Sequence, residues 1–198
     1  MFCPYDTERN GYNMNIEEII LNRRSVRKFK PQEIKYGILE NSVRLASYAP
    51  TAANLQYIKY KIVADKEMCA SVFDNVKWAG YLPDYNPSKD EQPAAYICIL
   101  TDKNIREKAD VDLGAAAQNI MLYAESLDIG TCWLGAINRE KIKELLKIPD
   151  KLDLNSVIAL GYKAEHPKTT PLTDSVKYFL DENGTLTVPK RTLSEILI

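Results

Sequence analysis

Cationic side chains are concentrated in one short segment near the start of the chain, between Arg23 and Lys30. Five lysines and arginines fall within these eight residues, together with the hydroxyl of Ser25. In an extended backbone, alternate side chains point to the same side, so Arg23, Ser25 and Arg27 would converge on one spot. Two guanidinium groups and a hydroxyl suit a phosphate dianion, since each charge-assisted contact contributes about 1.5–3 kcal/mol.

Two other interpretations fit the same charges. Cations at the end of a helix are favoured by the helix dipole without any ligand, and this segment follows a predicted helix. Nucleic-acid phosphate is a poorer ligand for this chain, because the net charge is −1 and nucleic-acid-binding proteins are usually clearly basic. From the charges alone, phosphate binding and helix-end stabilisation are equally good interpretations.

Two further segments combine small residues with hydrogen-bonding groups. In Ala49–Gln56, the small residues would let a flat ligand approach the backbone, and the polar side chains would suit a ring edge rich in amide-like groups. Asp112–Asn119 is followed by Gly130–Gly135, where a glycine at a strand end would let a ligand approach the main chain. The first segment is also a typical turn sequence, and the second also suits core packing, so both interpretations stay open.

The sequence lacks the groups that a side-chain nucleophile needs. Its single histidine, His166, lies in a polar stretch typical of a surface, so Ser–His or Cys–His catalysis has no base. It contains no Walker-type loop and no dinucleotide-binding glycine motif. The spacing of the four cysteines does not suit zinc, and no metal site is expected. For an enzyme, we therefore expect a bound cofactor to supply the reactivity and the chain to supply grip and orientation.

Hydrophobic periodicity predicts one domain, residues 1–198, of mixed α+β or three-layer α/β type. Its expected helices open at Asn15 and then cover about 34–49, 66–76, 112–127 and 138–149. Its expected strands cover 58–64, 94–100, 131–136 and 157–161. Residues 1–13 are expected to form a loose arm, 77–92 an irregular segment, and 163–198 an extended tail. The helix over 112–127 is apolar on more than one side, so we expect it in the domain centre or against a second copy of the chain.

Composition narrows the class of protein further. Hydrophobic residues make up 45% and charged residues 27% of the 198 residues, as in ordinary globular proteins. The longest apolar stretch, Ala94–Leu100, is far shorter than the roughly 20 residues of a membrane-spanning helix. Residues 1–11 have no apolar run that would suggest a secretory signal, and Cys98 and Cys132 lie in buried-strand patterns. We expect a cytoplasmic protein that binds neither membrane nor nucleic acid.

Taken together, these segments resemble the nitroreductase family of FMN flavoproteins over about residues 16–198. The resemblance depends on the order and spacing of several short pieces rather than on any one of them. The pieces are Arg23-Arg24-Ser25-x-Arg27, Ala49-Pro-Thr-Ala-Ala-Asn54-x-Gln56, the Asp112-x-Gly-Ala-Ala helix with Gln118-Asn119, Gly130–Gly135, and Lys190-Arg191.

The resemblance implies a nitroreductase-like fold, a three-layer mixed sheet flanked by helices, in an intertwined homodimer with FMN at the interface. It implies that the FMN phosphate and ribityl chain contact Arg23, Arg24, Ser25 and Arg27, with help from Lys190 or Arg191. It implies that the partner chain reaches the flavin through Pro50, Thr51, Ala52, Asn54 and Gln56. Backbone groups of Leu134 and Gly135 would lie near the flavin N5 atom, and no side chain would be a catalytic residue.

This sequence departs from the family pattern in the loop. Family members usually have Ser and Gly where Thr51, Ala52 and Ala53 stand, and often have proline after the glutamine, where this chain has Tyr57. The loop is therefore expected to sit differently over the ring. The variable segment after residue 77 often covers the flavin in the family, so its aromatic residues are candidates for stacking on a substrate, or for packing on the core. They are Trp78, Tyr81 and Tyr85.

The activity implied by the resemblance is a ping-pong transfer of a hydride from NAD(P)H, through flavin N5, to a small electron-poor acceptor such as a nitroaromatic or quinone. Two alternatives stay open. The first is the same fold with other flavin chemistry, namely dehalogenation, ene reduction or flavin breakdown. The second is a flavin-binding regulator without catalysis.

Overall fold

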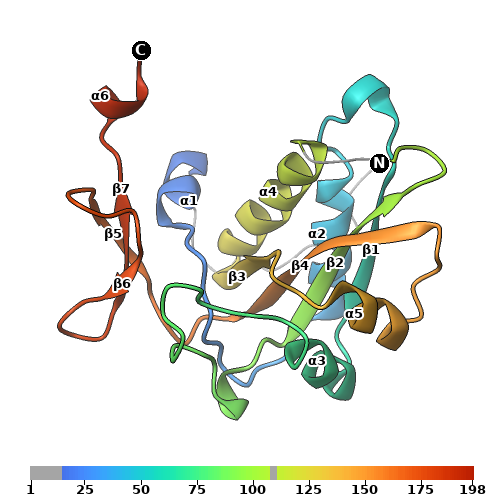
Figure 1. Cartoon of the computed structure of the whole chain (residues 1–198), viewed down its shortest axis with the longest axis horizontal. Coiled ribbons are helices and arrows are strands. Elements are labelled where there is room, and N and C mark those ends of the chain that lie inside the picture. The colour runs from blue at the N-terminus through green and yellow to red at the C-terminus, as the bar shows by residue number, and fades with distance from the viewer. Residues whose placement is uncertain (1–14, 108–110) are drawn as a thin grey trace.

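The computed structural model describes residues 15–107 and 111–198, so the expected arm at 1–13 lies outside the described residues. The predicted alternation of helices and strands is confirmed (Figure 1). The helices are α1 (Ile16–Asn22), α2 (Tyr36–Ala46), α3 (Lys66–Phe73), α4 (Val111–Glu125), α5 (Arg139–Leu145) and α6 (Leu193–Ile196). The strands are β1 (Ile58–Val63), β2 (Ala95–Asp102), β3 (Ile129–Leu134), β4 (Leu152–Tyr162), β5 (Lys168–Pro171), β6 (Phe179–Leu180) and β7 (Leu186–Lys190).

Side-chain caps start three of the helices. The Asn15 side chain accepts a hydrogen bond from the Glu18 backbone N–H, and the Glu18 carboxylate accepts one from the Asn15 backbone N–H. The two bonds form a capping box for α1. Asp65 caps α3 and Asn138 caps α5 in the same way, each by accepting from a backbone N–H three residues later. The starts of α1 and α5 are therefore determined by local sequence.

The central sheet has the strand order β1-β2-β4-β3, and its three strand pairings are antiparallel. Parallel pairing occurs at the sheet margin, in an isolated bridge between Ser25 and Thr131, and in the small C-terminal sheet between β5 and β7. β2 lies inside the sheet, and seven of its eight residues are buried, as its continuous apolar run predicts. β4 begins at Leu152, before its predicted start at residue 157. The prediction followed the continuous apolar run, whereas the first residues of the strand alternate apolar and polar side chains.

Helices cover both faces of this sheet, which gives the predicted three layers (Figure 1). On one face, α2 and α4 pack against alternate sheet residues, among them Ile97, Ile99 and Ile158. On the other face, α3 and α5 pack against the residues in between, such as Cys98 and Ala159. The side-chain alternation along each strand thus separates two hydrophobic clusters.

α4 and the tail define the margins of the molecule. α4 buries Leu113, Ala117 and Met121 against the sheet and α2, while residues on its other sides are only half buried in the single chain.

The tail, expected to be extended, folds back into the small sheet β5-β7-β6 before α6. Figure 1 shows this part at one end of the molecule, beyond α1. Among the described residues, no helix is long and apolar enough to span a membrane.

Candidate functional site

The cationic segment lies across the edge of the central sheet. The Val26 backbone N–H donates to the Thr131 carbonyl on β3 at 2.9 Å, and the Lys30 N–H donates to the Tyr162 carbonyl on β4 at 2.8 Å. Between these bonds, Val26 and Phe29 bury their side chains completely, at 1% and 0% exposed. Two backbone hydrogen bonds and two buried apolar side chains therefore fix the segment against the edge of the sheet.

Two glycines leave room for this crossing. Gly130 on β3 and Gly161 on β4 face each other in the strand register. A Cβ atom on Gly161 would stand 2.7–2.8 Å from atoms of Phe29, and one on Gly130 would stand 2.8 Å from Val26. Both contacts are too short for real side chains, so the glycine pair is what allows the cationic segment to approach the sheet.

Arg23 and Arg27 act on the same part of β3. Burial raises the pKa of the Cys132 thiol to about 11, and the positive charges of Arg27 and, more weakly, Arg23 oppose that rise. The Arg27 guanidinium lies 4.8 Å from the ring centre of Tyr178 in the tail. Its Nε atom is buried and has no hydrogen-bond partner among the described residues. The Arg23 guanidinium points instead at Met121 on α4, so the convergence of the two arginines on one spot stays a prediction.

Arg24 has different neighbours. Burial lowers the pKa of its guanidinium, the charge of Arg23 adds to this, and the carboxylate of Glu125 opposes it. Glu125 is 3% exposed and accepts a 2.7 Å hydrogen bond from Lys163, which also contacts Asp128. The Arg24 Nε is also buried, and the part of the chain that the structure describes gives it no hydrogen-bond partner. Arg24 thus lies beside a buried ion pair at the end of α4.

Glu165 holds the cationic segment from the side of the tail. Its carboxylate accepts hydrogen bonds from the backbone N–H of Arg27 and of Lys28, and from the hydroxyl of Tyr85. Desolvation, reinforced by this carboxylate, raises the pKa of Tyr85 above its ordinary value. One acidic side chain therefore connects the cationic segment to the irregular segment over 77–92.

The predicted ligand loop from Pro50 to Gln56 turns sharply beside the start of α4. Ala53, Asn54 and Gln56 have φ values of 51°, 52° and 50°, in the left-handed region that is costly for residues other than glycine. The Asp112 carboxylate accepts from the Ala52 N–H at 2.9 Å and from the Tyr57 hydroxyl at 2.7 Å. These hydrogen bonds lower the pKa of Asp112 and hold the loop in its strained form.

This loop and the cationic segment lie at opposite ends of α4 within one chain. The loop contacts Asp112 in the first turn, whereas the Arg23 guanidinium points at the sulfur of Met121, at 4.0 Å. The nine residue steps from Asp112 to Met121 span about 14 Å at ~1.5 Å per residue. The structure therefore does not bring the two sets of predicted residues together around one spot in a single chain.

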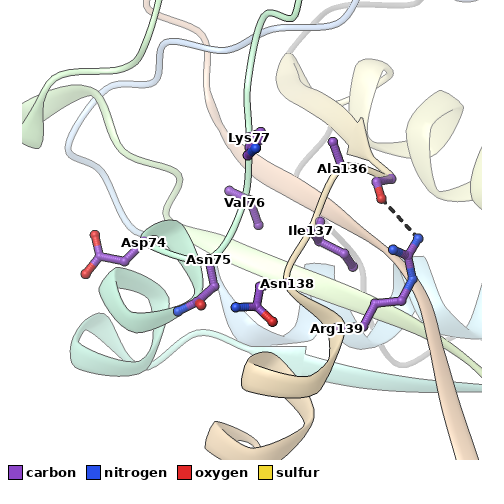
Figure 2. A pocket seen from close by; sticks show the side chains of 9 residues that line it. Asp74, Asn75, Val76, Lys77, Ala136, Ile137, Asn138 and Arg139 are labelled. Atoms are coloured by element: carbon purple, nitrogen blue, oxygen red, sulfur yellow. Dashed lines mark hydrogen bonds between the residues drawn. The ribbon is translucent and has the colours of Figure 1, made fainter.

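The end of β3 is open on one side. Leu134 is buried, but Gly135 is exposed, and a Cβ atom built on it would meet nothing within 4 Å. Residues 74–77 and 135–139 line an open pocket of about 450 Å³ at this point (Figure 2). The Arg139 side chain reaches back to the main chain of this turn and donates to the Gly135 carbonyl at 3.0 Å.

The other predicted residues have varied surroundings. Trp78 packs against Phe73, with ring centres 5.6 Å apart, so it belongs to the core rather than to an open face. Tyr81 is 52% exposed and its ring lies 5.0 Å from that of Tyr178. Lys190 ends β7, and Arg191 pairs with Glu195 at 3.6 Å. Tyr85 bonds to Glu165, so the three aromatic side chains have three different partners: Phe73 for Trp78, Tyr178 for Tyr81 and Glu165 for Tyr85.

Comparison with known proteins adds to this geometry. Residues 20–162, more than half of the chain, match the family model described as the nitroreductase family. The chain belongs to the nitroreductase family.

Relatives of this nitroreductase family chain match most of its length. An Archaeoglobus fulgidus protein, provisionally named NADH dehydrogenase/NAD(P)H nitroreductase, is 32% identical over 152 residues, which cover 73% of this chain and 83% of that protein. A similarly named crystal structure from Parabacteroides distasonis has 26% identity and a TM-score of 0.66, covering 81% of this chain and 92% of that one. A Clostridium difficile structure titled FMN-dependent nitroreductase has 29% identity and a TM-score of 0.61, covering 74% and 87%.

Sequence reasoning missed several residues that shape this candidate site. Glu165 contacts Arg27 across a separation of 138 residues, and the Gly130–Gly161 pair depends on strand register. Arg139 was not among the predicted residues. No local pattern marks these residues, although a glycine inside each of two strand patterns does suggest that another backbone passes close by.

Proposed function

We propose that this chain is an FMN-dependent oxidoreductase that works as a homodimer and takes its hydride from NAD(P)H. The observation that carries this proposal is the cationic segment fixed in the glycine notch, the space left by Gly130 and Gly161. Its buried guanidinium N–H groups lack an acceptor among the described residues. Family membership and the names of the relatives support the same chemistry.

Three features of the described residues fit FMN. The unpaired Nε atoms of Arg24 and Arg27 are donors of the kind that a phosphate accepts. The open space at Gly135 admits a flat ring against the main chain. Thr131, beside the cationic segment, is four residues from Gly135, or about 13 Å at ~3.3 Å per residue, a length that an extended flavin mononucleotide can bridge.

Each predicted residue then has a role in binding. Arg23, Arg24, Ser25 and Arg27 would hold the phosphate and ribityl chain, and Lys190 or Arg191 would add charge from the tail. Backbone groups of Leu134 and Gly135 would face the ring. When bound, FMN would supply the nitrogen N5, which accepts a hydride and passes it on.

The separation along α4 supports the proposed homodimer. Pro50, Thr51, Ala52, Asn54 and Gln56 lie one helix length away from the arginines of their own chain. We propose that they contact the flavin held by the partner chain, with the Asp112 hydrogen bonds keeping the loop in shape. Half-buried residues on the outer sides of α4 would be covered by the same association.

The acceptor would be a small electron-poor molecule, such as a nitroaromatic or quinone, that alternates with NAD(P)H at one face in ping-pong order. Among the candidate aromatic residues, Tyr81 is the one with a largely exposed ring, so we assign substrate stacking to Tyr81 before Trp78 and Tyr85. Anaerobic reduction followed by an acceptor screen distinguishes this activity from dehalogenation, ene reduction or flavin breakdown. A flavin-binding regulator would consume no NAD(P)H in steady state.

The phosphate assignment is tested by Arg23→Ala. We expect FMN to bind about 10–100-fold more weakly, since one charge-assisted contact contributes about 1.5–3 kcal/mol. The measurement is quenching of flavin fluorescence on titration with the apoprotein. Arg44→Ala, an exposed arginine on α2 bonded to Asn41, is the matched control and should bind FMN like the parent. Unchanged affinity in Arg23→Ala contradicts the assignment, and a parent protein that binds no flavin contradicts the function.

A further inference from the structure

Arg139 stands where the electrostatics of its own helix are unfavourable. It is the first residue of α5, after the cap Asn138, and a positive charge in the first turn opposes the helix dipole. Its side chain turns back from the helix toward the turn after β3, as Figure 2 shows, although the residue stays exposed. One guanidinium nitrogen donates to two carbonyls, that of Gly135 at 3.0 Å and that of Asn155 at 2.9 Å.

A β-bulge makes the second carbonyl available. In the pairing of β2 with β4, Ile99 faces Ser156 and Leu100 faces Leu154, so Asn155 has no partner on β2. The Asn155 side chain fixes the bulge by donating to the hydroxyl of Thr101 at 2.8 Å. Bulges release backbone groups from the ladder and are frequent beside functional sites. Arg139 uses the released carbonyl to connect β4 with the turn after β3.

The peptide between Gly135 and Ala136 is fixed as a result. Its carbonyl accepts from Arg139 and also from the Ile137 N–H at 3.1 Å. The next carbonyl, that of Ala136, accepts from the Lys77 N–H at 2.8 Å. A trans peptide is planar and its N–H points opposite to its C=O, so holding the Gly135 carbonyl also sets the direction of the Ala136 N–H.

The Ala136 N–H has no acceptor among the described residues 15–107 and 111–198. It belongs to an exposed turn beside the open space at Gly135. Hydrogen bonding of a cation to the carbonyl of the same peptide polarises the amide and strengthens its N–H as a donor. The turn therefore offers one oriented, strengthened donor on the side where the proposed function puts the flavin ring.

We propose that Arg139 is a positioning residue, which orients the Gly135–Ala136 peptide so that the Ala136 N–H donates to the edge of the bound flavin. This inference depends on the proposed function, because it needs the ring at Gly135. A fixed donor at that edge stabilises the negative charge that the ring gains on reduction. Arg139 thereby acts on the flavin through the main chain, without touching it.

The test compares Arg139→Gln and Arg139→Lys with the control Lys141→Gln, which removes the same charge from an exposed position two residues further along α5. In Arg139→Gln we expect FMN affinity to change less than about threefold, the reduction potential of bound FMN to become more negative, and hydride transfer from NAD(P)H to slow by about tenfold. Arg139→Lys keeps one cationic donor and should recover part of both effects. Lys141→Gln should match the parent.

Amide hydrogen exchange gives a readout that is independent of activity. In the parent, FMN should protect the Ala136 amide from exchange, and Arg139→Gln should lose most of that protection. In the apoprotein, the Ile137 amide should exchange faster in Arg139→Gln, because its acceptor carbonyl is no longer held. Circular dichroism and urea unfolding establish that each variant is folded.

Three outcomes overturn the inference. The first is a folded, FMN-binding Arg139→Gln variant whose flavin reduction potential and hydride-transfer rate equal those of the parent. The second is an equal shift in Lys141→Gln, which would mean that only overall charge matters. The third is an Ala136 amide that FMN does not protect in the parent. A parent that binds no FMN is a different result, since it contradicts the proposed function itself.

Discussion

At the scale of single residues, Asp112 connects the ligand loop to the start of α4. Its carboxylate accepts from a main-chain N–H of the loop and from the Tyr57 hydroxyl, and Arg106 adds a favourable charge nearby. All three interactions favour the ionised form, with the Tyr57 hydrogen bond the largest of them, so the pKa of Asp112 lies below its ordinary value. A carboxylate with a lowered pKa stabilises the fold only while it stays ionised.

Replacing Asp112 by asparagine should therefore have an effect that depends on pH. Because the folded pKa is depressed, the contribution of Asp112 is fully present above its unfolded pKa, about 3.9, and is lost as pH falls through the folded value. We expect Asp112→Asn to be less stable than the parent at pH 6, with the difference closing below about pH 4. Urea unfolding of both proteins across this range measures it. A difference that stays constant down to pH 3 would falsify the role given to the charge.

At the scale of elements, the cationic segment depends on the notch made by two strands. Val26 and Phe29 occupy the space that side chains at Gly130 and Gly161 would need. Burial of these two side chains holds the backbone against the strands and leaves the arginine side chains only half buried. The proposed phosphate site therefore depends on packing against glycines as much as on the arginines themselves.

Gly161→Ala should disturb both the fold and the site. The added Cβ would meet Phe29 at about 2.8 Å, and overpacking of this kind costs roughly 1–3 kcal/mol. We expect a lower free energy of unfolding and weaker FMN binding, because relief of the contact displaces the arginine segment. Gly80→Ala is the control, since a Cβ there meets nothing within 4 Å. Denaturant unfolding and flavin titration test both effects. A Gly161→Ala variant as stable as the control would contradict the requirement for glycine at this position.

At the scale of the whole molecule, several apolar side chains lack cover in the single chain. On α1, Ile16 and Leu21 are 62% and 60% exposed, and on α6 Leu193 and Ile196 are 67% and 61% exposed. Together with the position of the ligand loop at the far end of α4, these surfaces support the proposed association of two copies.

The homodimer is tested by sedimentation velocity. We expect the parent to sediment as a dimer and Leu193→Glu to shift toward monomer, because a carboxylate placed in an apolar interface loses its hydration. FMN should then bind more weakly, since the partner's loop is missing. Lys141→Glu, on exposed α5, should stay dimeric. A parent that is monomeric at micromolar concentration contradicts the proposal.

The local sequence determined the elements and the chemical character of this protein. Caps at Asn15 and Asn138, the period of each helix and strand, and the buried run of β2 are all properties of neighbouring residues, and all agree with the fold. The charges of Arg23 and Arg27 fitted a phosphate site and helix-end stabilisation equally well, and the resemblance to the family favoured the phosphate.

Only the tertiary structure decided what supports those charges. The Glu165 contacts, the facing glycines Gly130 and Gly161, and the link from Arg139 to Asn155 join residues from different elements. Such contacts depend on strand register and on the bulge in β4, which shift with the pairing of whole strands rather than with any local residue pattern. The sequence therefore specifies which groups are available, and the packing of the sheet specifies which of them meet.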